Sequence, residues 1–342
     1  MKKAKILFFI LVPIISFYFL DVNYVNATET DFSVEIKPPE NQIDKNNTYF
    51  DLMVNPEEKQ LLEVVLTNKT EKEIAVDVRV TNARSTMTGL IDYSPMENKD
   101  DKSLKYNMKN LVKNKSKEAI IVPGRGSSIV QLQMELPKDL QEGIILGGID
   151  FRLKDEGKNE IRSKGANVGN VYAIVKGIQL HNGVLPLPKI NLSQARVVKF
   201  KKNPTIVVNY QNSEAVSVFK MKTHTIIKDD NGKVFLEDEK TDLQMAPNSN
   251  VDFPTEWKES AMASGSYVAE VTATIGEKKW TEKLPFTVTP KDSKETKSSP
   301  SEVRVEEKDN RILYVILFLM SILIVGLSIY LVVMRKTKND KE

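Results

Sequence analysis

The sequence predicts an all-β protein made of two tandem immunoglobulin-like β-sandwiches, flanked by an N-terminal signal peptide and one C-terminal transmembrane helix. Two observations predict the sandwiches. Apolar and polar residues alternate at period two through most of the chain, and short turn-forming sequences separate these runs. A third observation, an apolar stretch near each end of the 342 residues, predicts the flanking segments.

The first β-sandwich is expected over residues 31–155. The run 74–80 alternates apolar residues with polar or small ones, which is typical of a strand with one buried and one solvated face. The run 130–136 repeats the pattern and ends at a proline. The stretch 94–117 is rich in lysine and asparagine and lacks the pattern, so we expect an exposed loop there.

The second β-sandwich is expected over residues 163–290. The runs 221–227 and 267–275 alternate in the same way, and Asp229-Asp230-Asn231-Gly232 follows the first of them. Because Asn-Gly tolerates positive φ, we expect a hairpin with a type I′ turn and no calcium loop. The polar segment 154–165 between the sandwiches is expected to be flexible, which leaves their relative orientation open.

The two ends of the chain predict a membrane topology. Residues 1–27 combine a basic start, an apolar run and a small-residue cleavage site, as a secretory signal peptide does. Residues 312–334 are uncharged and, at about 1.5 Å per residue, long enough for a bilayer core of about 30 Å. The basic tail 335–342 then lies in the cytoplasm, and the polar stretch 291–311 forms a flexible stalk. The expected location is the cell membrane, with a single span and the ectodomain outside.

Composition excludes several functional classes. The net charge of +3 comes from the two ends of the chain, so the near-neutral middle lacks the basic surface of a nucleic-acid-binding protein. The chain has no cysteine, which excludes disulfides, thiol catalysis and cysteine metal sites. A cysteine-free exported ectodomain suggests a bacterial protein.

No catalytic constellation stands out in the sequence. The two histidines, His181 and His224, have neither a metalloprotease spacing nor a nucleophile elbow nearby. The glycine-rich string 143–148 lacks the Gly-Lys-Ser/Thr of a phosphate-binding loop and favours a packed strand, with glycines where a backbone or a ligand approaches closely. We therefore predict no catalytic, cofactor-binding or metal-ligating residues and no enzymatic activity.

Several longer strings resemble the WxL-interacting protein family. In the first domain these strings are Phe32-Ser33-Val34, Pro39-Glu40-Asn41-Gln42, Tyr49-Phe50-Asp51-Leu52, Gly89-Leu90-Ile91-Asp92-Tyr93 and Glu142-Gly143-Ile144-Ile145-Leu146-Gly147-Gly148-Ile149. In the second they are Gln244-Met245-Ala246-Pro247-Asn248-Ser249-Asn250, Ser264-Gly265-Ser266-Tyr267 and Lys278-Lys279-Trp280. The resemblance covers about residues 31–290. It implies a surface protein of a Gram-positive bacterium whose first domain binds peptidoglycan, whose second binds a host component, and whose partners include WxL-domain proteins.

A glycan-peptide ligand is held by amides, hydroxyls and carboxylates, with an aromatic ring against the sugar. Side chains of these types lie in the first-domain strings, and we expect ligand contacts from Asn41, Gln42, Tyr49, Asp51, Asp92 and Tyr93. A purely structural role in a turn or in the core is the alternative for each of them.

Four functions follow from this sequence, and the first is favoured. It is a non-enzymatic, membrane-anchored protein that binds peptidoglycan and helps to retain or display WxL-domain proteins at the cell wall. The alternatives are an adhesin whose second domain binds a host extracellular-matrix protein, a scaffold that needs a WxL partner for any wall contact, and a wall hydrolase.

Overall fold

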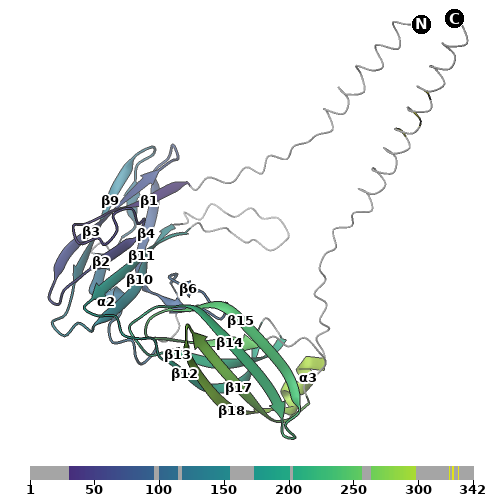
Figure 1. Cartoon of the computed structure of the whole chain (residues 1–342). Helices are drawn as coiled ribbons and strands as arrows, with labels where there is room; N and C mark the ends of the chain where they lie inside the picture. Colours follow the sequence, from purple (N-terminus) through teal and green to yellow (C-terminus); the bar gives the residue numbers. More distant parts are fainter. Residues whose placement is uncertain are drawn as a thin grey trace, which may run out of the picture.

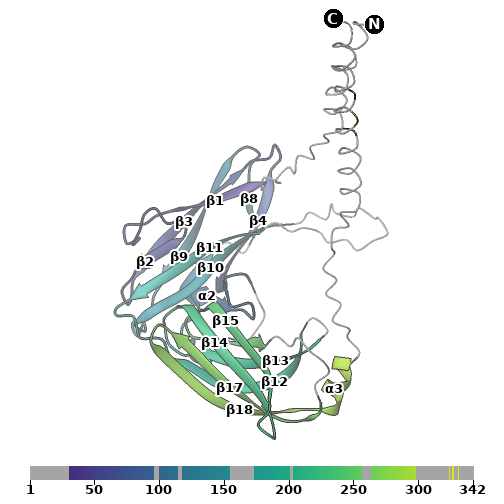
Figure 2. The same cartoon turned by 45° about the vertical axis from the view of Figure 1, so that its right-hand side comes forward.

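The computed structural model describes residues 31–95, 100–114, 118–154, 173–200, 203–255 and 263–297, and the single positions 323, 326 and 330. Almost all regular structure in these residues is β-strand, which confirms the all-β class. The strands form two β-sandwiches that meet at one end of each (Figure 1 and Figure 2). The finer assignment of an immunoglobulin-like topology stays a prediction.

The first sandwich packs a four-stranded sheet against a five-stranded sheet. The four-stranded sheet has the order β1 (Phe32–Lys37), β3 (Lys59–Asn68), β9 (Ser127–Glu135) and β7 (Val112–Asn114). The five-stranded sheet has the order β2 (Phe50–Met53), β11 (Ala173–Asn182), β10 (Gly143–Leu153), β4 (Ile74–Asn82) and β8 (Ile120–Val122). Alternate side chains of both sheets point inward and form one apolar core. In β9, for example, Val130, Leu132 and Met134 are buried in it. The strands predicted at 74–80 and 130–136 are confirmed.

Strand β11 belongs to the first sandwich. It pairs antiparallel with β10 over ten residues and runs parallel to β2 on its other side. The boundary expected from the sequence assigns residues 163 onward to the second domain, so the strand pairing extends the first structural unit to Asn182. Period-two alternation shows that a segment is a strand, but it does not show which sheet completes its hydrogen bonds.

The polar stretch 94–117 is not the exposed loop that the sequence predicts. Its described part contains the short helix α2 (Met108–Leu111) followed by β7. Met108, Leu111 and Val112 are all buried in the first core. The Asn82 side-chain oxygen accepts the Met108 backbone N–H (2.8 Å) and so ties the start of α2 to β4. The lysines and asparagines around these three buried residues obscure them in the sequence.

The second sandwich packs a three-stranded sheet against a four-stranded sheet. The first has the order β12 (Ile190–Phe200), β13 (Asn203–Asn212) and β16 (Ser249–Thr255). The second has the order β15 (Val234–Met245), β14 (Val218–Asp229), β17 (Gly265–Ile275) and β18 (Lys278–Val288). Tyr210 and Phe253 pack edge to face at the centre of this core, with ring centroids 5.0 Å apart. The helix α3 (Pro290–Lys297) follows at the end away from the first sandwich, within the first residues of the expected stalk (Figure 1).

The hairpin between β14 and β15 is confirmed, but its turn is not type I′. Only Gly232 in this loop has positive φ (+77°), whereas a type I′ turn needs positive φ at both central residues. The Asp229 carboxylate accepts the backbone N–H groups of Asn231 (3.0 Å) and Lys233 (2.9 Å). The aspartate therefore fixes the loop by hydrogen bonding to its own backbone.

The two sandwiches are docked by close contacts at glycines. The small hairpin of β5 (Arg84–Ser85) and β6 (Ile91–Asp92) extends from the first sandwich to the second (Figure 1). At its tip, a Cβ on Gly89 would lie 2.3 Å from Leu243 Cδ2. A Cβ on Gly143 would lie 2.4 Å from the Ala215 carbonyl oxygen. Only glycine allows these two approaches.

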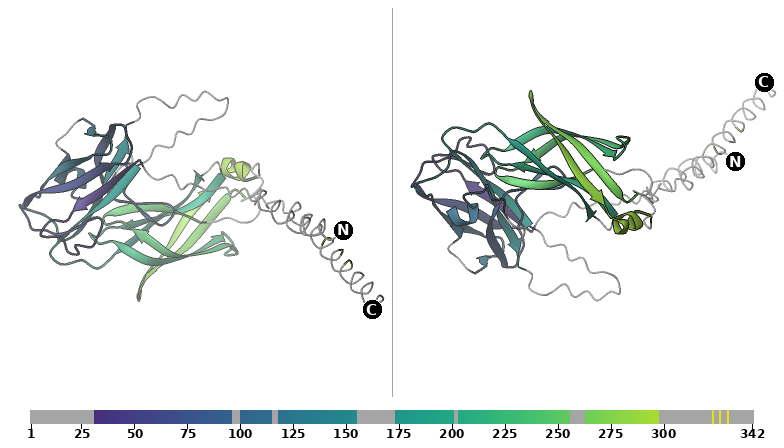
Figure 3. Two further views of the ribbon diagram at one scale, coloured as in Figure 1. Left: turned by 90° about the horizontal axis from the view of Figure 1, so that it is seen from above. Right: turned by 90° about the horizontal axis from the view of Figure 1, so that it is seen from below.

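Figure 3 shows the two sandwiches from above and below. Hydrogen bonds and a small apolar cluster complete the contact between them. The backbone N–H of Gln244 donates to Gly89 O (2.7 Å), and that of Ile144 donates to Ala215 O (2.6 Å). Beside these bonds Leu146, Ile144 and Ala83 of the first sandwich pack against Ala246 of the second. The interface thus joins backbone to backbone, and it fixes the orientation that the sequence leaves open.

The predicted signal peptide, most of the predicted transmembrane helix and the basic tail lie outside the described residues. Among the helices of the described residues, none combines the length and the apolar character needed to cross a membrane.

Candidate functional site

The outer face of the five-stranded sheet carries the candidate site. In β10, Ile145, Ile149 and Phe151 point into the core, so the even-numbered residues between them point outward. Gly148 of β10 lies opposite Gly177 of β11 in the strand register. Because neither residue has a side chain, the backbone itself forms the surface at this point. We call this pair the glycine floor.

Two tyrosines stand over the glycine floor. A Cβ on Gly177 would lie 3.6 Å from Tyr49 Cβ, and a Cβ on Gly148 would lie 2.9 Å from Tyr93 Cβ. Burial raises the pKa of both phenols above the ordinary value. The charge of the Tyr49 phenolate adds to the rise in the pKa of Tyr93. Tyr49 remains 38% exposed, which leaves one face of this tyrosine pair open to a ligand.

A polar cluster lies at one end of the glycine floor, next to Tyr49. Asp51 of β2 pairs with Gln179 of β11, and its Oδ1 accepts the Gln179 side-chain N–H (3.1 Å). His181 Nε2 lies 2.8 Å from the same oxygen, and Asn47 Nδ2 donates to Oδ2 (3.3 Å). These contacts hold the carboxylate in a fixed orientation, and only 8% of Asp51 is exposed.

A charged pair lies at the other end of the glycine floor. Asp150 is two residues beyond Gly148 on the same face of β10, and only 1% of it is exposed. Arg152 follows on that face, with its Nε 3.6 Å from Asp150 Oδ2. Burial raises the pKa of Asp150 and outweighs the opposing effect of Arg152 and Arg79.

Two of the residues expected to contact a ligand make hydrogen bonds that hold the chain beside the site. Gln42 is buried, donates to Tyr49 O (2.9 Å) and accepts the Asp51 backbone N–H (3.2 Å). Asn41 donates from Nδ2 to Met53 O (3.0 Å) and to Glu58 Oε1 (3.0 Å). The structure thus gives Gln42 a positioning role for both Tyr49 and Asp51.

Asp92 also shapes the backbone. Its carboxylate accepts the Ser94 backbone N–H (3.0 Å) and the Ser94 hydroxyl (2.6 Å), which closes a turn around Tyr93. On the opposite side, the Thr81 hydroxyl donates to the Tyr93 carbonyl oxygen. The turn and this bond direct the Tyr93 side chain over the sheet.

The structure therefore brings together Tyr49, Asp51 and Tyr93, whereas Asn41, Gln42 and Asp92 support them. Sequence reasoning missed the other members of the face, which are Gln179, His181, Asp150 and Arg152. All four follow the alternation of β10 and β11, but the sequence does not show that β11 lies between β2 and β10.

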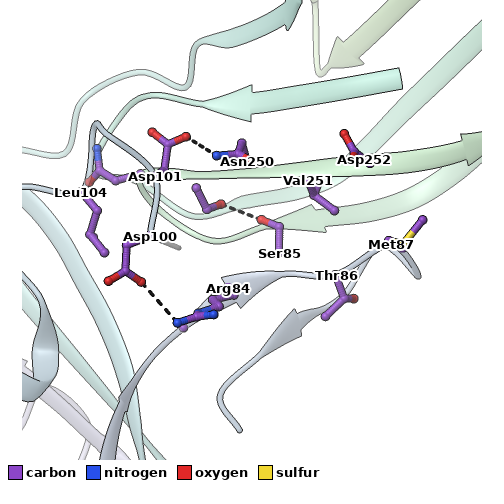
Figure 4. Close-up of a pocket in the computed structure, with 13 residues that line it drawn as sticks. Arg84, Ser85, Thr86, Met87, Asp100, Asp101, Leu104, Asn250, Val251 and Asp252 are labelled. Carbon is purple, nitrogen blue, oxygen red and sulfur yellow. Dashed lines mark hydrogen bonds and ion pairs between the residues drawn. The ribbon is translucent and has the colours of Figure 1, made fainter. Parts of the chain in front are cut away.

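A cavity of about 350 Å³ between the two sandwiches is a second place where a ligand could lie (Figure 4). Its polar side chains, however, mainly bind one another. Arg84 pairs with Asp100 (3.3 Å), and Asp101 accepts hydrogen bonds from Gln211 (2.9 Å) and Asn250 of the second sandwich. These contacts join the two sandwiches, so the outer face of the five-stranded sheet is the better candidate.

Comparison with known proteins finds a matching family model for each half of the chain. Residues 32–152 match a family model described as the WxL interacting protein, peptidoglycan binding domain. Residues 163–298 match the model described as the WxL interacting protein, host binding domain. The chain belongs to the WxL interacting protein family. In this WxL interacting protein the glycine floor, the tyrosine pair and Asp51 lie within the first structural unit, with β11 contributing from beyond residue 152.

Solved structures show only distant likeness to this WxL interacting protein. A chaperone–tip adhesin complex of CFA/I fimbriae biogenesis is 11% identical, with a TM-score of 0.32, and the match covers 74% of this chain and 98% of the other. The E. coli chaperone DraB is also 11% identical, with a TM-score of 0.29 and coverage of 75% and 98%. No curated protein matched the sequence.

Proposed function

We propose that this protein is a non-enzymatic surface protein of a Gram-positive bacterium that binds peptidoglycan through the outer face of its five-stranded sheet. Membership of the WxL interacting protein family supports the ligand class. The observation that carries the proposal is the tyrosine pair over the glycine floor, with the Asp51 cluster beside it. A sugar ring packs against aromatic side chains, and its hydroxyl groups bind carboxylates and amides.

The protein acts at the outer face of the cell membrane in this proposal. The support is the uncharged run 312–334, the basic tail after it and the signal-like residues 1–27. A membrane tether keeps the sandwiches at high local concentration near the wall. Fractionation of producing cells should place the full-length chain in the membrane fraction, and removal of residues 312–342 should release it into the medium.

Wall binding is tested by sedimentation of the full-length protein with purified peptidoglycan. We expect the wild type to co-sediment, and a Tyr49→Ala, Tyr93→Ala double variant to lose most of this binding because the aromatic surface is gone. Phe219→Ala removes an exposed aromatic side chain from the second sandwich and serves as the matched control. Failure of the wild type to sediment would contradict the proposal.

Retention of WxL-domain proteins is the second part of the proposed function. Its support is family membership alone. The sedimentation should be repeated with a WxL-domain protein added. If that protein sediments only when this chain is present, the chain retains it at the wall. Sedimentation of this chain only in the presence of the WxL protein would instead make the WxL protein the wall-binding partner.

Binding of a host extracellular-matrix protein is a second candidate function, and the second sandwich would carry it. The match to a host binding domain and the exposed edge strand β15 favour it. Val234 and Phe235 of β15 are 51% and 38% exposed, and an edge strand can pair with an extended segment of a partner. Retention on immobilised matrix proteins should fall in a Phe235→Ala variant and stay unchanged in Tyr49→Ala.

A further inference from the structure

Strand β15 leaves one of its two sides without a strand partner in the described part of the chain. It is the edge strand of its sheet and pairs with β14 on the other side. From Leu236 to Lys240 this pairing is regular, with one residue opposite one residue. The register then shifts before Leu243, and Asp242 has positive φ (+58°). We call the stretch 234–240, which ends before this irregularity, the open edge.

The far end of β15 already receives backbone from the first sandwich. The Gln244 N–H donates to Gly89 O (2.7 Å), and Leu243 lies against the same glycine. The hairpin of β5 and β6 thus occupies the free side of β15 beyond Asp242. The open edge continues directly from this interface, so it offers an added strand the same kind of backbone contact.

The open edge is acidic on its outer face. Leu236 packs against the core of the second sandwich, so Glu237 and Glu239 point to the opposite, outer face. Both glutamates are exposed. On the core side, Lys240 Nζ lies 3.2 Å from Asp238 Oδ2, and these two charges compensate each other. The outer face therefore presents two carboxylates that are two residues apart.

This charge pattern disfavours a second copy of the chain and favours a basic strand. If two β15 strands paired antiparallel about Asp238, Glu237 of each would lie opposite Glu239 of the other, and like charges directly opposite each other destabilise a sheet. Opposite charges stabilise it. On the β14 side, Glu237 Oε1 already has a basic side chain beside it, because His224 Nε2 lies at 2.7 Å.

We propose that the open edge binds an extended segment of a host extracellular-matrix protein that carries two basic residues two positions apart. The segment adds a strand beside β15, and its two basic side chains lie next to Glu237 and Glu239. The residue between them faces the core side, next to Leu236. This inference rests on the second candidate function, the binding of a host matrix protein, and specifies the chemistry of that partner.

Synthetic heptapeptides test the charge pattern, with binding to the full-length protein measured by fluorescence anisotropy. The probe is Thr-Val-Lys-Val-Lys-Val-Thr. A peptide of the same composition, Thr-Val-Val-Lys-Lys-Val-Thr, keeps the charge but places the lysines next to each other. A third, Thr-Val-Glu-Val-Glu-Val-Thr, reverses the charge of the probe.

Two double variants complete the design. Glu237→Lys, Glu239→Lys reverses the charge of the open edge. The matched control is Glu277→Lys, Glu282→Lys, which reverses two exposed carboxylates in the turn before β18 and on β18, the opposite edge strand of the same sheet. All four side chains are exposed, so both variants should melt close to the wild type.

We expect the wild type to bind the probe at least tenfold more tightly than the peptide with adjacent lysines. Glu237→Lys, Glu239→Lys should weaken binding of the probe at least tenfold and should bind the glutamate peptide, because the charges are exchanged. The control variant should bind the probe as the wild type does. Hydrogen exchange in segment 234–240 should slow when the probe is bound, since backbone N–H groups then donate to the added strand.

Equal binding of the two lysine peptides, or unchanged binding of the probe by Glu237→Lys, Glu239→Lys, would overturn the proposal. Retention of that variant on immobilised matrix proteins, combined with loss of retention in Phe235→Ala, would exclude the basic partner while the second candidate function stands. A wild type that binds the probe and no matrix protein would overturn the matrix source and the second candidate function together.

Discussion

Gly148 and Gly177 face each other across β10 and β11, yet they differ in the room that a methyl group would find. A Cβ on Gly148 would meet Tyr93 Cβ at 2.9 Å and Val175 Cγ1 at 3.1 Å. A Cβ on Gly177 would make only ordinary contacts, the shortest being 3.6 Å to Tyr49. Neither residue has positive φ, so space alone decides the outcome of a substitution.

The two glycines therefore give a matched pair of variants. Gly148→Ala should destabilise the protein by about 1–3 kcal/mol, because the new methyl group displaces Tyr93. Gly177→Ala should change stability by less than about 1 kcal/mol. Denaturant unfolding of both variants measures the difference, and equal destabilisation would show that the tyrosines do not pack on the floor as described. Gly148→Ala should also weaken wall binding more than Gly177→Ala does, because its methyl group displaces Tyr93 as well.

We expect Asp101 to make the contact between the sandwiches depend on pH. Burial alone would raise the pKa of Asp101, but hydrogen bonds from Ser103, Asn250 and Gln211 outweigh burial and lower it. A group whose pKa is lower in the folded state stabilises the protein at pH values above its pKa in the unfolded state, which is about 3.9 for aspartate. This stabilisation is lost as the pH falls through the pKa of the folded state.

We therefore expect acid below about pH 4 to weaken the docking of the two sandwiches. Small-angle scattering between pH 3 and pH 6 should show an increase in the radius of gyration at the acid end. Asp101→Asn should remove that part of the pH dependence. An unchanged profile in Asp101→Asn would assign the transition to other carboxylates.

Residue types alone could suggest part of the site. Tyr49, Asp51 and Tyr93 are aromatic or acidic residues in the strings that resemble the family, and they do lie on one sheet face. Asp150 and His181 could not be found in this way, because their relation to the site depends on the neighbours of β11. Hydrogen bonds from Gln42 and Asp92 to the backbone are likewise not visible in a residue list.

At the scale of elements, β11 is the strand on which the first sandwich depends. It lies between β2 and β10 in the sheet, so its absence would leave the edges of both neighbours unpaired. Ile178 and Leu180 of this strand are also buried in the first core. A cut near residue 162, which the sequence suggests as a domain boundary, removes all of these contacts.

A fragment of residues 28–162 should therefore fail to fold, whereas residues 28–188 should fold. The free energy lost includes the burial of Ile178 and Leu180, at about 1.5–3 kcal/mol for each side chain. Circular dichroism and the dispersion of amide proton signals distinguish the two fragments. A stable 28–162 fragment would show that β11 is dispensable.

The elements themselves were largely predictable, because a strand that buries one face carries its period in its own residues. The runs in β4, β9, β14 and β17 all show this. What could not be predicted is the partner of each strand, since pairing depends on residues far away in the chain. The same limit applies to α2, whose buried Met108 and Leu111 lie in a segment too short to show a period.

At the scale of the whole molecule, the glycine contacts make the two sandwiches one unit. Gly89 has positive φ (+80°) and no room for a Cβ beside Leu243. Gly276 also has positive φ (+58°), but nothing lies within 4 Å of its Cβ position. A substitution at either residue strains the backbone, because both have positive φ. Only at Gly89 does the new side chain also meet the other sandwich.

Gly89→Val should therefore separate the sandwiches, and Gly276→Val should not. Both variants lose about 1–3 kcal/mol from the unfavourable backbone conformation. Only Gly89→Val should increase the radius of gyration of a fragment of residues 28–298 in small-angle scattering. An unchanged radius in Gly89→Val would mean that Leu243 moves aside within the docked unit.

The position of β11 also has a mechanical consequence. The chain leaves the first sandwich from the end of this strand, directly after Asn182, and continues into the second. If the wall holds the first sandwich and the membrane holds the C-terminus, tension enters the five-stranded sheet along the axis of β11. The hydrogen bonds to β10 and β2 lie across that axis, so they resist the load together in shear and do not open one after another. A strand in this place suits a protein that must stay attached while the cell wall is pulled away from the membrane.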